Sequence, residues 1–372
     1  AMRQIVLGLG GVSQGVPRES GFDITAASEV MAMLCLAENA DDLRARLTRT
    51  LVGTRADGTA VTAGEIGGVG AMLALLRDAL MPNLVQSAEG VPAFLHGGPF
   101  ANIAHGCNSV LATRMALHHA DYAVTEAGFG SELGAEKFFH IKCRASGLDP
   151  AAVVVVATIR ALKMHGRARK EALAQADPEA VRAGIPNLEA HLANVATFGK
   201  PAVVALNRFA GDTEAEIHVV RDACARAGVR FALAEHFARG GEGAAALAEE
   251  VVAACAEGAN RPWRPVYELE DSPQDKIRKI ARALYGADDV EFDGRARRDL
   301  ERAAALGFDR LPVCIAKPPS TLSGRPLDLG RPRGFTLTVR EVEIASGAGF
   351  LVALTGELFR MPGLPRSPQA LG

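Results

Sequence analysis

The chain has 372 residues, of which 48% are hydrophobic and 23% are charged, so it is long enough to bury a large core and to form two or three domains. Its 41 basic and 43 acidic residues give a formal net charge of −2. This balance provides no general attraction to nucleic acid or to an anionic membrane surface. Any site for an anion must therefore be local.

The cysteines and the apolar runs indicate the cellular compartment. Six cysteines are scattered without a close pair, which fits neither a structural zinc site nor the disulfide framework of a small secreted domain. The longest apolar run, Ala151 to Ala157, is far shorter than a bilayer span, and the first residues do not have the pattern of a signal peptide. We expect a cytoplasmic protein with reduced thiols, no membrane segment and no metal held by its own side chains.

Strand and helix patterns alternate along the chain. Gln4 to Gly11 predicts a short strand that enters a glycine loop, and Ala26 to Glu38 has the apolar spacing of a buried helix. Strands alternating with helices predict an α/β fold with a mainly parallel sheet that is covered on both faces. Further strands are expected at residues 93–95, 122–125, 151–158, 202–206 and 230–233.

Two stretches interrupt this pattern and divide the chain. The polar segment Gly166 to Pro186 contains two prolines and predicts a linker, after which Asn187 to Phe198 predicts a helix. Two further prolines interrupt the helical pattern in Gly258 to Pro265. The predicted domains are a large one at 1–186 and two smaller α/β domains at 187–265 and 266–372.

The segment His96 to Ser109 is rich in glycine and in polar side chains. Gly97 and Gly98 would let backbone N–H groups approach a ligand closely, while Asn102 and His105 offer side-chain hydrogen bonds beside them. This combination suits a phosphate or a carboxylate. The alternative is that the glycines only turn the chain and that the histidines are satisfied polar groups of the core.

A second glycine-rich block runs from Thr125 to Phe138. It places Phe129 between two glycines, where the ring is available to pack on a planar ligand, although an ordinary loop position explains it equally well. Glu136 and Lys137 follow, and we expect them at the solvated start of a helix rather than in a site.

Two cations follow the apolar run that ends near Ala157. Arg160 and Lys163 are three residues apart and share a face if this part is helical. A guanidinium offers a planar fork to oxyanions, and an ammonium offers a mobile point charge. We expect both side chains to serve an anionic substrate, with a solvated helix face as the alternative.

Two loops follow the later strands, where open α/β sheets usually bind ligands. Asn207 and Asp212 lie after the first of these strands, and we assign them, with Gly97 and Gly98, to a nucleotide or phosphate. Phe209 and Phe237 follow different strands and would lie at the same sheet edge if those strands are parallel. Their rings could then sandwich a heteroaromatic ring; two phenylalanines of the core are the alternative.

The blocks at 96–109, 125–138 and 156–166 together resemble the formate-tetrahydrofolate ligase family (10-formyltetrahydrofolate synthetase). The likeness continues in Lys276 to Ile280 and in Leu329 to Arg333. It implies part of a sheet of P-loop NTPase-like type. It also implies a step of one-carbon metabolism, in which formate formylates tetrahydrofolate at the expense of ATP, through formyl phosphate.

The resemblance also implies the ligands and their contacts. They are formate, tetrahydrofolate, ATP with Mg²⁺, and a monovalent cation, bound by a cytoplasmic homotetramer without nucleic-acid or membrane partners. Phe209 and Phe237 would clamp the pterin ring, with Phe129 and Leu233 nearby. Family members commonly have tryptophan at the position of Phe237, so the clamp here should differ in shape. We expect the catalytic groups to be Arg160, Lys163, His105 and Asn102.

The resemblance covers only part of the family's length. Family members begin with a P-loop of the G-x-x-x-x-G-K-[ST] type, and this chain has no such motif. We therefore expect an incomplete chain that is inactive alone and belongs to an active longer parent. The alternative is a non-catalytic folate-binding or oligomerisation module. A third interpretation, a nicotinamide-dependent Rossmann enzyme, is supported only by Gly8 to Gly11, and this segment lacks the full dinucleotide fingerprint.

Overall fold

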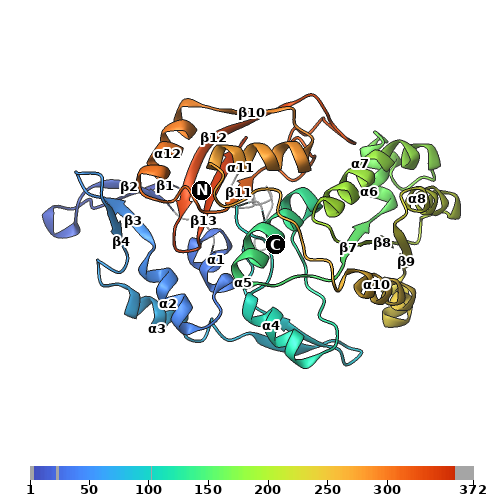
Figure 1. The fold of residues 1–372 in the computed structure, drawn as a ribbon, viewed down its shortest axis with the longest axis horizontal. Coiled ribbons are helices and arrows are strands. Elements are labelled where there is room, and N and C mark those ends of the chain that lie inside the picture. Colours follow the sequence, from blue (N-terminus) through green and yellow to red (C-terminus); the bar gives the residue numbers. More distant parts are fainter. Residues whose placement is uncertain (1–3, 22–24, 102, 357–372) are drawn as a thin grey trace.

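The computed structural model describes residues 4–21, 25–101 and 103–356. Figure 1 shows three regions: the N-terminal hairpins and helices, a small sheet with its helices at the right, and a longer sheet at the top built from the C-terminal residues. The described residues contain no helix that is both long and apolar enough to cross a membrane.

The N-terminal region consists of three antiparallel hairpins and four helices. Ser28 caps the first helix by accepting a hydrogen bond from the N–H of Val30, and residues 32–36 of the helix are all buried, as expected of a buried helix. The strands are β1 (Gln4–Leu7), β2 (Arg18–Gly21), β3 (Leu51–Thr54), β4 (Ala60–Thr62), β5 (Asn83–Gln86) and β6 (Pro92–Leu95). The helices are α1 (Glu29–Leu36), α2 (Ala40–Thr48), α3 (Val69–Leu76) and α4 (Val110–His119).

The chain next passes through the centre of the molecule. Two segments with π-type hydrogen bonding, Gly130–Ala135 and Phe138–Cys143, lead into the short helix α5 (Arg144–Ser146). Both wide segments are largely buried. Such widened turns are rare and often lie at functional sites.

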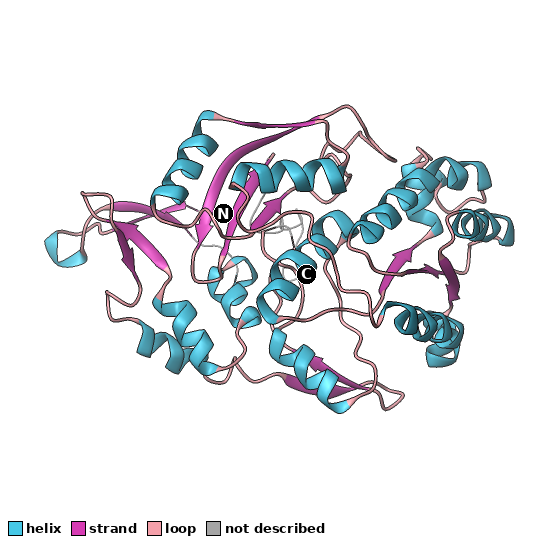
Figure 2. Ribbon diagram, viewed as in Figure 1, coloured by secondary structure: helices cyan, strands magenta, loops and turns pink. Residues whose placement is uncertain are grey.

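The parallel sheet has three strands in the order β7-β8-β9. Figure 2 shows helices on both of its faces, and Figure 1 identifies α6, α7 and α8 on one side and α10 on the other. Val204 and Leu206 of the central strand pack with the helices of the first side. The elements are β7 (Val153–Ala157), α6 (Ile159–His165), α7 (Pro178–Thr197), β8 (Ala202–Asn207), α8 (Glu214–Arg226), β9 (Arg230–Ala234), α9 (His236–Arg239) and α10 (Ala245–Gly258).

The linker predicted to end at Pro186 is wrong in its second half. Helix α7 begins at Pro178, where the Asp177 side chain accepts a hydrogen bond from the N–H of Ala180 at 2.9 Å, and it continues through Pro186. The boundary at residue 186 therefore falls inside a helix. Packing explains the continuity: a Cβ added at Gly184 would lie 2.0 Å from the carbonyl oxygen of Leu162, so the absence of a side chain lets α6 and α7 touch.

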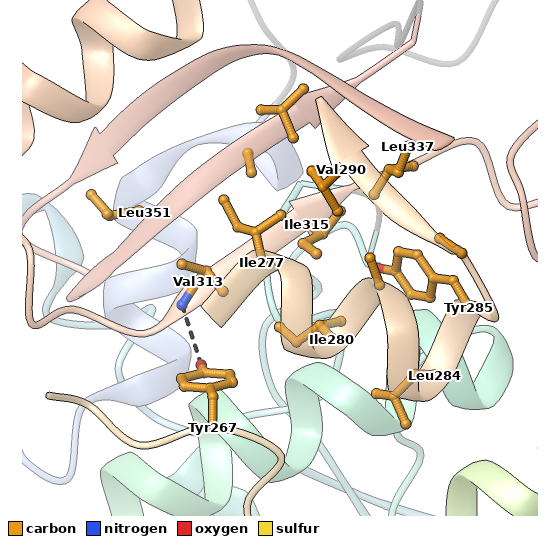
Figure 3. Close-up of a cluster of buried hydrophobic side chains, with 14 of the residues drawn as sticks. Tyr267, Ile277, Ile280, Leu284, Tyr285, Val290, Val313, Ile315, Leu337 and Leu351 are labelled. Atoms are coloured by element: carbon orange, nitrogen blue, oxygen red, sulfur yellow. Dashed lines mark hydrogen bonds between the residues drawn. The ribbon is translucent and has the colours of Figure 1, made fainter. Parts of the chain in front are cut away.

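The C-terminal region is a mixed sheet in the order β10-β12-β13-β11, covered by two helices. Figure 3 shows Ile277 and Ile280 of α11 beside Val290 and Ile315 of the sheet. The hydroxyl of Tyr267 accepts a hydrogen bond from the N–H of Val313 at 3.2 Å. The elements are α11 (Pro273–Ile280), β10 (Asp289–Phe292), α12 (Gly294–Ala305), β11 (Val313–Ala316), β12 (Thr336–Ala345) and β13 (Phe350–Thr355).

The fold is α/β, and it contains a parallel sheet as the alternation predicted. That sheet has three strands, and the hairpins and the mixed sheet supply the remaining pairs, so one mainly parallel sheet does not run through the described residues. The strand predicted at Tyr122 to Thr125 is also wrong. This segment has no partner strand, and the Thr125 hydroxyl instead donates to Oδ1 of Asn108 at 2.8 Å.

A buried ion pair joins α6 to α8. Nζ of Lys163 lies 2.5 Å from Oε1 of Glu216, and it also donates to the backbone carbonyls of Leu173 and Gln175. Burial would raise the pKa of Glu216. Hydrogen bonds from the Asp177 backbone, from Lys163 and from the residue that caps α8 nevertheless lower it to about 2. The carboxylate therefore stays charged and paired.

Removing the cation from this pair should destabilise the protein. In Lys163→Ala the Glu216 carboxylate stays buried without its partner, and we expect the free energy of unfolding to fall by about 3–5 kcal/mol. The control is Arg160→Ala, which changes an exposed side chain of the same helix and should shift stability by less than about 0.5 kcal/mol. Urea denaturation measures both, and equal midpoints for the two variants would contradict the assignment.

Candidate functional site

The carboxyl ends of β8 and β9 lie side by side. The two strands are parallel, with Asn207 opposite Ala234, so the loops that follow them leave the same edge of the sheet. Phe209 is 53% exposed in the first loop, and Phe237 is 92% exposed in α9 after the second strand. Neither ring is buried in the core, which rules out the alternative of two core phenylalanines.

The turn that carries Phe209 is closed by Asp212. Its carboxylate Oδ2 accepts the N–H of Phe209 at 2.9 Å, and its own N–H donates to the Phe209 carbonyl at 3.0 Å. Asn207, the last residue of β8, is half-buried directly before this turn. The structure thus places Asn207 and Asp212 beside Phe209, and it shows that the Asp212 carboxylate already shapes the loop.

An ion pair that the sequence reading missed ties the two loops together. The Arg208 guanidinium lies 3.0 Å from Oε1 of Glu235, the first residue after β9, and 3.0 Å from Oε1 of Glu214. Partly exposed pairs of this kind contribute at most about 1 kcal/mol to stability. Their value here is positional, because the pair fixes the spacing of the loops that bear Phe209 and Phe237. The sequence could have indicated this pair, because Arg208 and Glu235 carry opposite charges and each directly follows a strand of the parallel sheet.

The other two residues expected near the pterin are Leu233, on β9, and Phe129, directly before the first π-type segment. Leu233 of β9 is half-buried and packs against the core of the three-stranded sheet. Phe129 is 69% exposed, between Gly128 and Gly130, both of which have positive φ. The segment after Phe129 is fastened to α7, since Oγ of Ser131 lies 2.7 Å from Nδ1 of His191.

The glycines after β6 have different surroundings. A Cβ added at Gly97, where φ is +72°, would lie 2.1 Å from Sγ of Cys35, so close packing on α1 requires a glycine there. A Cβ at Gly98 would meet nothing within 4 Å, and the Gly98 backbone hydrogen-bonds to the side chain of Cys35. His96 is buried and hydrogen-bonded to Ser109 Oγ and to the carbonyl of Ala79, as a satisfied core histidine would be. Asn102 lies outside the described residues.

His105 is fully buried, and neither ring nitrogen has a hydrogen-bond partner among the described residues. Burial, followed by the positive charges of Lys142, Arg46 and Lys137, lowers the pKa of this imidazole to about 3. The ring is therefore neutral near pH 7 and offers a donor and an acceptor rather than a charge. Buried polar groups normally have partners, so this imidazole is an exception among the described residues.

The expectation that Glu136 and Lys137 are solvated is wrong, because both side chains are fully buried. Oε1 of Glu136 lies 2.8 Å from Nδ1 of His140, and the Lys137 ammonium donates to the carbonyl of Ala101. These groups lie where the two π-type segments meet, so the widened turns direct them inward. The helix start predicted from sequence assumed an ordinary α-helix with one solvated side.

Sequence reasoning also missed Lys142, whose buried ammonium donates to Asn108 Oδ1 at 2.8 Å and to Thr113 Oγ1 at 2.9 Å. Burial lowers the pKa of this lysine. We call the three cations around the His105 ring, Lys137, Lys142 and Arg46, the buried basic cluster. In the structure, these cations already have protein partners: Arg46 pairs with Asp42 at 3.0 Å, and the two lysines donate to a carbonyl and an amide oxygen.

Arg160 and Lys163 lie on a helix, as expected, but their side chains do not share one exposed surface. Lys163 is 1% exposed and engaged with Glu216, whereas Arg160 is exposed in the first turn of α6. The helix has only seven residues and packs Ile159, Leu162 and Lys163 against the neighbouring helices. Because α6 follows β7, which is parallel to β8, Arg160 lies at the same sheet edge as Phe209.

The buried imidazole predicts a dependence of stability on pH. Its pKa falls from an ordinary 6.5 to about 3 on folding, so below about pH 6.5 the unfolded chain binds a proton that the folded chain excludes. Between pH 7 and pH 5 this one group should lower the free energy of unfolding by about 2 kcal/mol. Urea unfolding of wild type, His105→Asn and the exposed control His118→Asn measures this loss. A loss in His105→Asn equal to that in wild type would contradict the assignment.

Comparison with known proteins gives a consistent result over the whole chain. Residues 1–372 match the family model described as formate--tetrahydrofolate ligase. The chain is 54% identical over 371 residues to a protein of Myxococcus xanthus (strain DK1622) named "Formate--tetrahydrofolate ligase", which covers 99% of this chain and 67% of the relative. It is 55% identical over 370 residues to a protein of the same name from Paracoccus denitrificans (strain Pd 1222), covering 100% of this chain and 66% of that relative. It thus spans about two thirds of the length of these relatives. The chain belongs to the formate-tetrahydrofolate ligase family, a family of ligases.

Proposed function

We propose that this protein formylates tetrahydrofolate with formate and ATP, through formyl phosphate, to give 10-formyltetrahydrofolate. Family membership supports the reaction. The structural observation that carries the folate part is the pair of exposed rings, Phe209 and Phe237, at one edge of a parallel sheet. The identity to two proteins named as ligases favours an enzyme over a non-catalytic folate-binding or oligomerisation module.

The two phenylalanines would hold the pterin ring between them. Large exposed rings mark sites of interaction when they gather on one surface, and each stacked ring adds about 0.5–1.5 kcal/mol beyond the burial of its area. The ion pair between Arg208 and Glu235 supports this role because it joins the two loops before any ligand binds. Leu233 and Phe129 would extend the apolar contact.

The reaction needs positive charge in two steps. A formate oxygen attacks the γ-phosphorus of ATP and ADP leaves; the 10-nitrogen of tetrahydrofolate then attacks the formyl carbon, and phosphate leaves with the proton balance completed by solvent. Preorganised positive groups stabilise the charge that develops in such steps. We assign this role to Arg160 and to the buried basic cluster, with His105 and Asn102 as hydrogen-bonding groups. Lys163 would act indirectly, by fixing α6.

The remaining parts of the proposal concern ligands and assembly. Gly97, Gly98, Asn207 and Asp212 would face phosphate groups of the nucleotide, which binds together with Mg²⁺, and a monovalent cation would favour activity. The parallel β7-β8-β9 sheet with helices on both faces supports an arrangement of the P-loop NTPase-like type. We further propose a cytoplasmic homotetramer, on the basis of family membership.

The reaction is tested with the complete product of the gene, because this chain spans about two thirds of its relatives' length. With ATP, formate and tetrahydrofolate, we expect one ADP for each 10-formyltetrahydrofolate. When the formate carries ¹⁸O, one labelled oxygen should appear in the released phosphate, because the bridging oxygen of formyl phosphate stays with phosphorus. ADP formation without formate, or a folded product that forms no formylated folate, would overturn the proposal.

The aromatic pair is tested by binding to the 372-residue chain. Phe209→Leu should weaken tetrahydrofolate binding by about 1 kcal/mol, or about fivefold, because stacking is lost while much of the apolar area remains. Phe237→Trp should maintain or tighten binding, since the larger ring offers more stacking area. Leu75→Ala, at an exposed leucine on α3, is the control for a general loss of apolar surface. Calorimetric titration that gives Phe209→Leu the wild-type affinity would exclude the clamp.

A further inference from the structure

We propose that Glu89, at the tip of the β5–β6 hairpin, is a positioning residue that holds the Phe237 side of the aromatic pair in place. The inference rests on the proposed function, because it concerns the folate site. The hairpin that carries Glu89 lies 152 residues before Gly241 in the sequence, outside the motifs described above.

The contact is direct and made by both carboxylate oxygens. The N–H of Gly241 lies 2.8 Å from Oε1 and 2.9 Å from Oε2 of Glu89. Gly241 belongs to the 3-10 turn Gly240–Ala244, which follows α9 and therefore comes directly after the helix that carries Phe237. Hydrogen bonds to a charged acceptor are shorter and stronger than neutral ones.

The Glu89 carboxylate lies close to two glycines. A Cβ added at Gly240 would lie 2.2 Å from a Glu89 carboxylate oxygen, and one added at Gly241 would lie 2.5 Å from the other. Gly240 also has φ +59°, a conformation that side chains with a Cβ rarely adopt. The backbone conformation thus favours glycine at 240, while at 241 an added Cβ would meet only the carboxylate of Glu89.

The hairpin presents Glu89 from a defined turn. The N–H of Ser87 donates to the carbonyl of Val91 at 2.9 Å, and the N–H of Gly90 donates to the carbonyl of Ser87 at 3.0 Å. The Ser87 hydroxyl oxygen accepts the N–H of Val91 at 3.0 Å. These bonds fix the turn on both sides of Glu89, so its carboxylate is offered to Gly241 from a closed loop.

The base of the hairpin is fixed as well. His96 follows β6, and its ring nitrogens contact Ser109 Oγ at 2.6 Å and the Ala79 carbonyl at 2.7 Å. The hairpin is therefore followed directly by the block that contains Gly97, Gly98 and His105, and its tip contacts the turn after Phe237. It connects the part of the candidate site assigned to anions with the part assigned to folate.

The physical role of this contact is preorganisation. A loop with adjacent glycines loses more conformational entropy on ordering than other loops do, and a ligand that must order it binds more weakly. The ion pair from Arg208 holds the first residue of the loop, Glu235, while Glu89 holds it beyond Phe237. The backbone on both sides of Phe237 is thus held in place, while its ring stays exposed.

The test compares Glu89→Ala, Glu89→Gln and the control Glu249→Ala, which removes an exposed carboxylate of α10. Hydrogen exchange of the amides at 236–243 and calorimetric titration with tetrahydrofolate are measured on the 372-residue chain. In Glu89→Ala we expect faster exchange at Gly241 and about fivefold weaker binding. Glu89→Gln keeps one acceptor oxygen, so its exchange rate at Gly241 and its affinity for tetrahydrofolate should be close to those of wild type. Glu249→Ala should match wild type in both measurements.

The same variants in the complete gene product separate positioning from chemistry. The KM for tetrahydrofolate should rise in Glu89→Ala, while kcat and the KM for formate stay near wild type. Unchanged exchange at Gly241 in Glu89→Ala would overturn the proposal, as would equal weakening of binding by Ala and Gln, which points to charge alone. A third outcome is that Gly241 exchanges faster in Glu89→Ala but the wild-type protein binds no tetrahydrofolate. That outcome would support the contact and overturn the proposed function instead.

Discussion

The parallel register between β8 and β9 is the constraint on which the candidate site depends. It places Asn207 opposite Ala234 and so brings two loops, 27 residues apart at Arg208 and Glu235, to one edge. Strand β8 is the central strand and is buried on both faces, as the strands of a parallel sheet covered by helices are. The ion pair, the exposed rings and the hairpin contact all follow from this pairing.

Charge inside the molecule is handled differently from charge at its surface. Lys163, Lys142 and Lys137 are buried, and each directs its ammonium to carboxylate, amide or carbonyl oxygens, which meets the cost of removing a cation from water. His105 avoids this cost by staying neutral. The interior also holds the carboxylates of Glu136 and Glu216, so buried charges of both signs lie close to hydrogen-bonding partners.

Sequence patterns predicted what depends on local apolar spacing and on strand ends. The strands at 151–158, 202–206 and 230–233, the shared edge of Phe209 and Phe237, and the family itself were confirmed. Three features depended on tertiary packing and could not be found this way. Helix α7 passes through Pro186 because its first half packs on α6, and Glu136 is buried because the helix widens. Glu89 acts across 152 residues, which no local pattern reports.

The contact between Gly184 and the carbonyl of Leu162 has a consequence for how this protein can change over time. A methyl group at 184 would wedge α6 away from α7 and thereby shift the first turn of α6, where Arg160 lies, relative to the sheet edge. Position 184 bears no functional group, yet its substitution would alter the electrostatics of a distant surface. Position 184 is therefore constrained although it has no side chain.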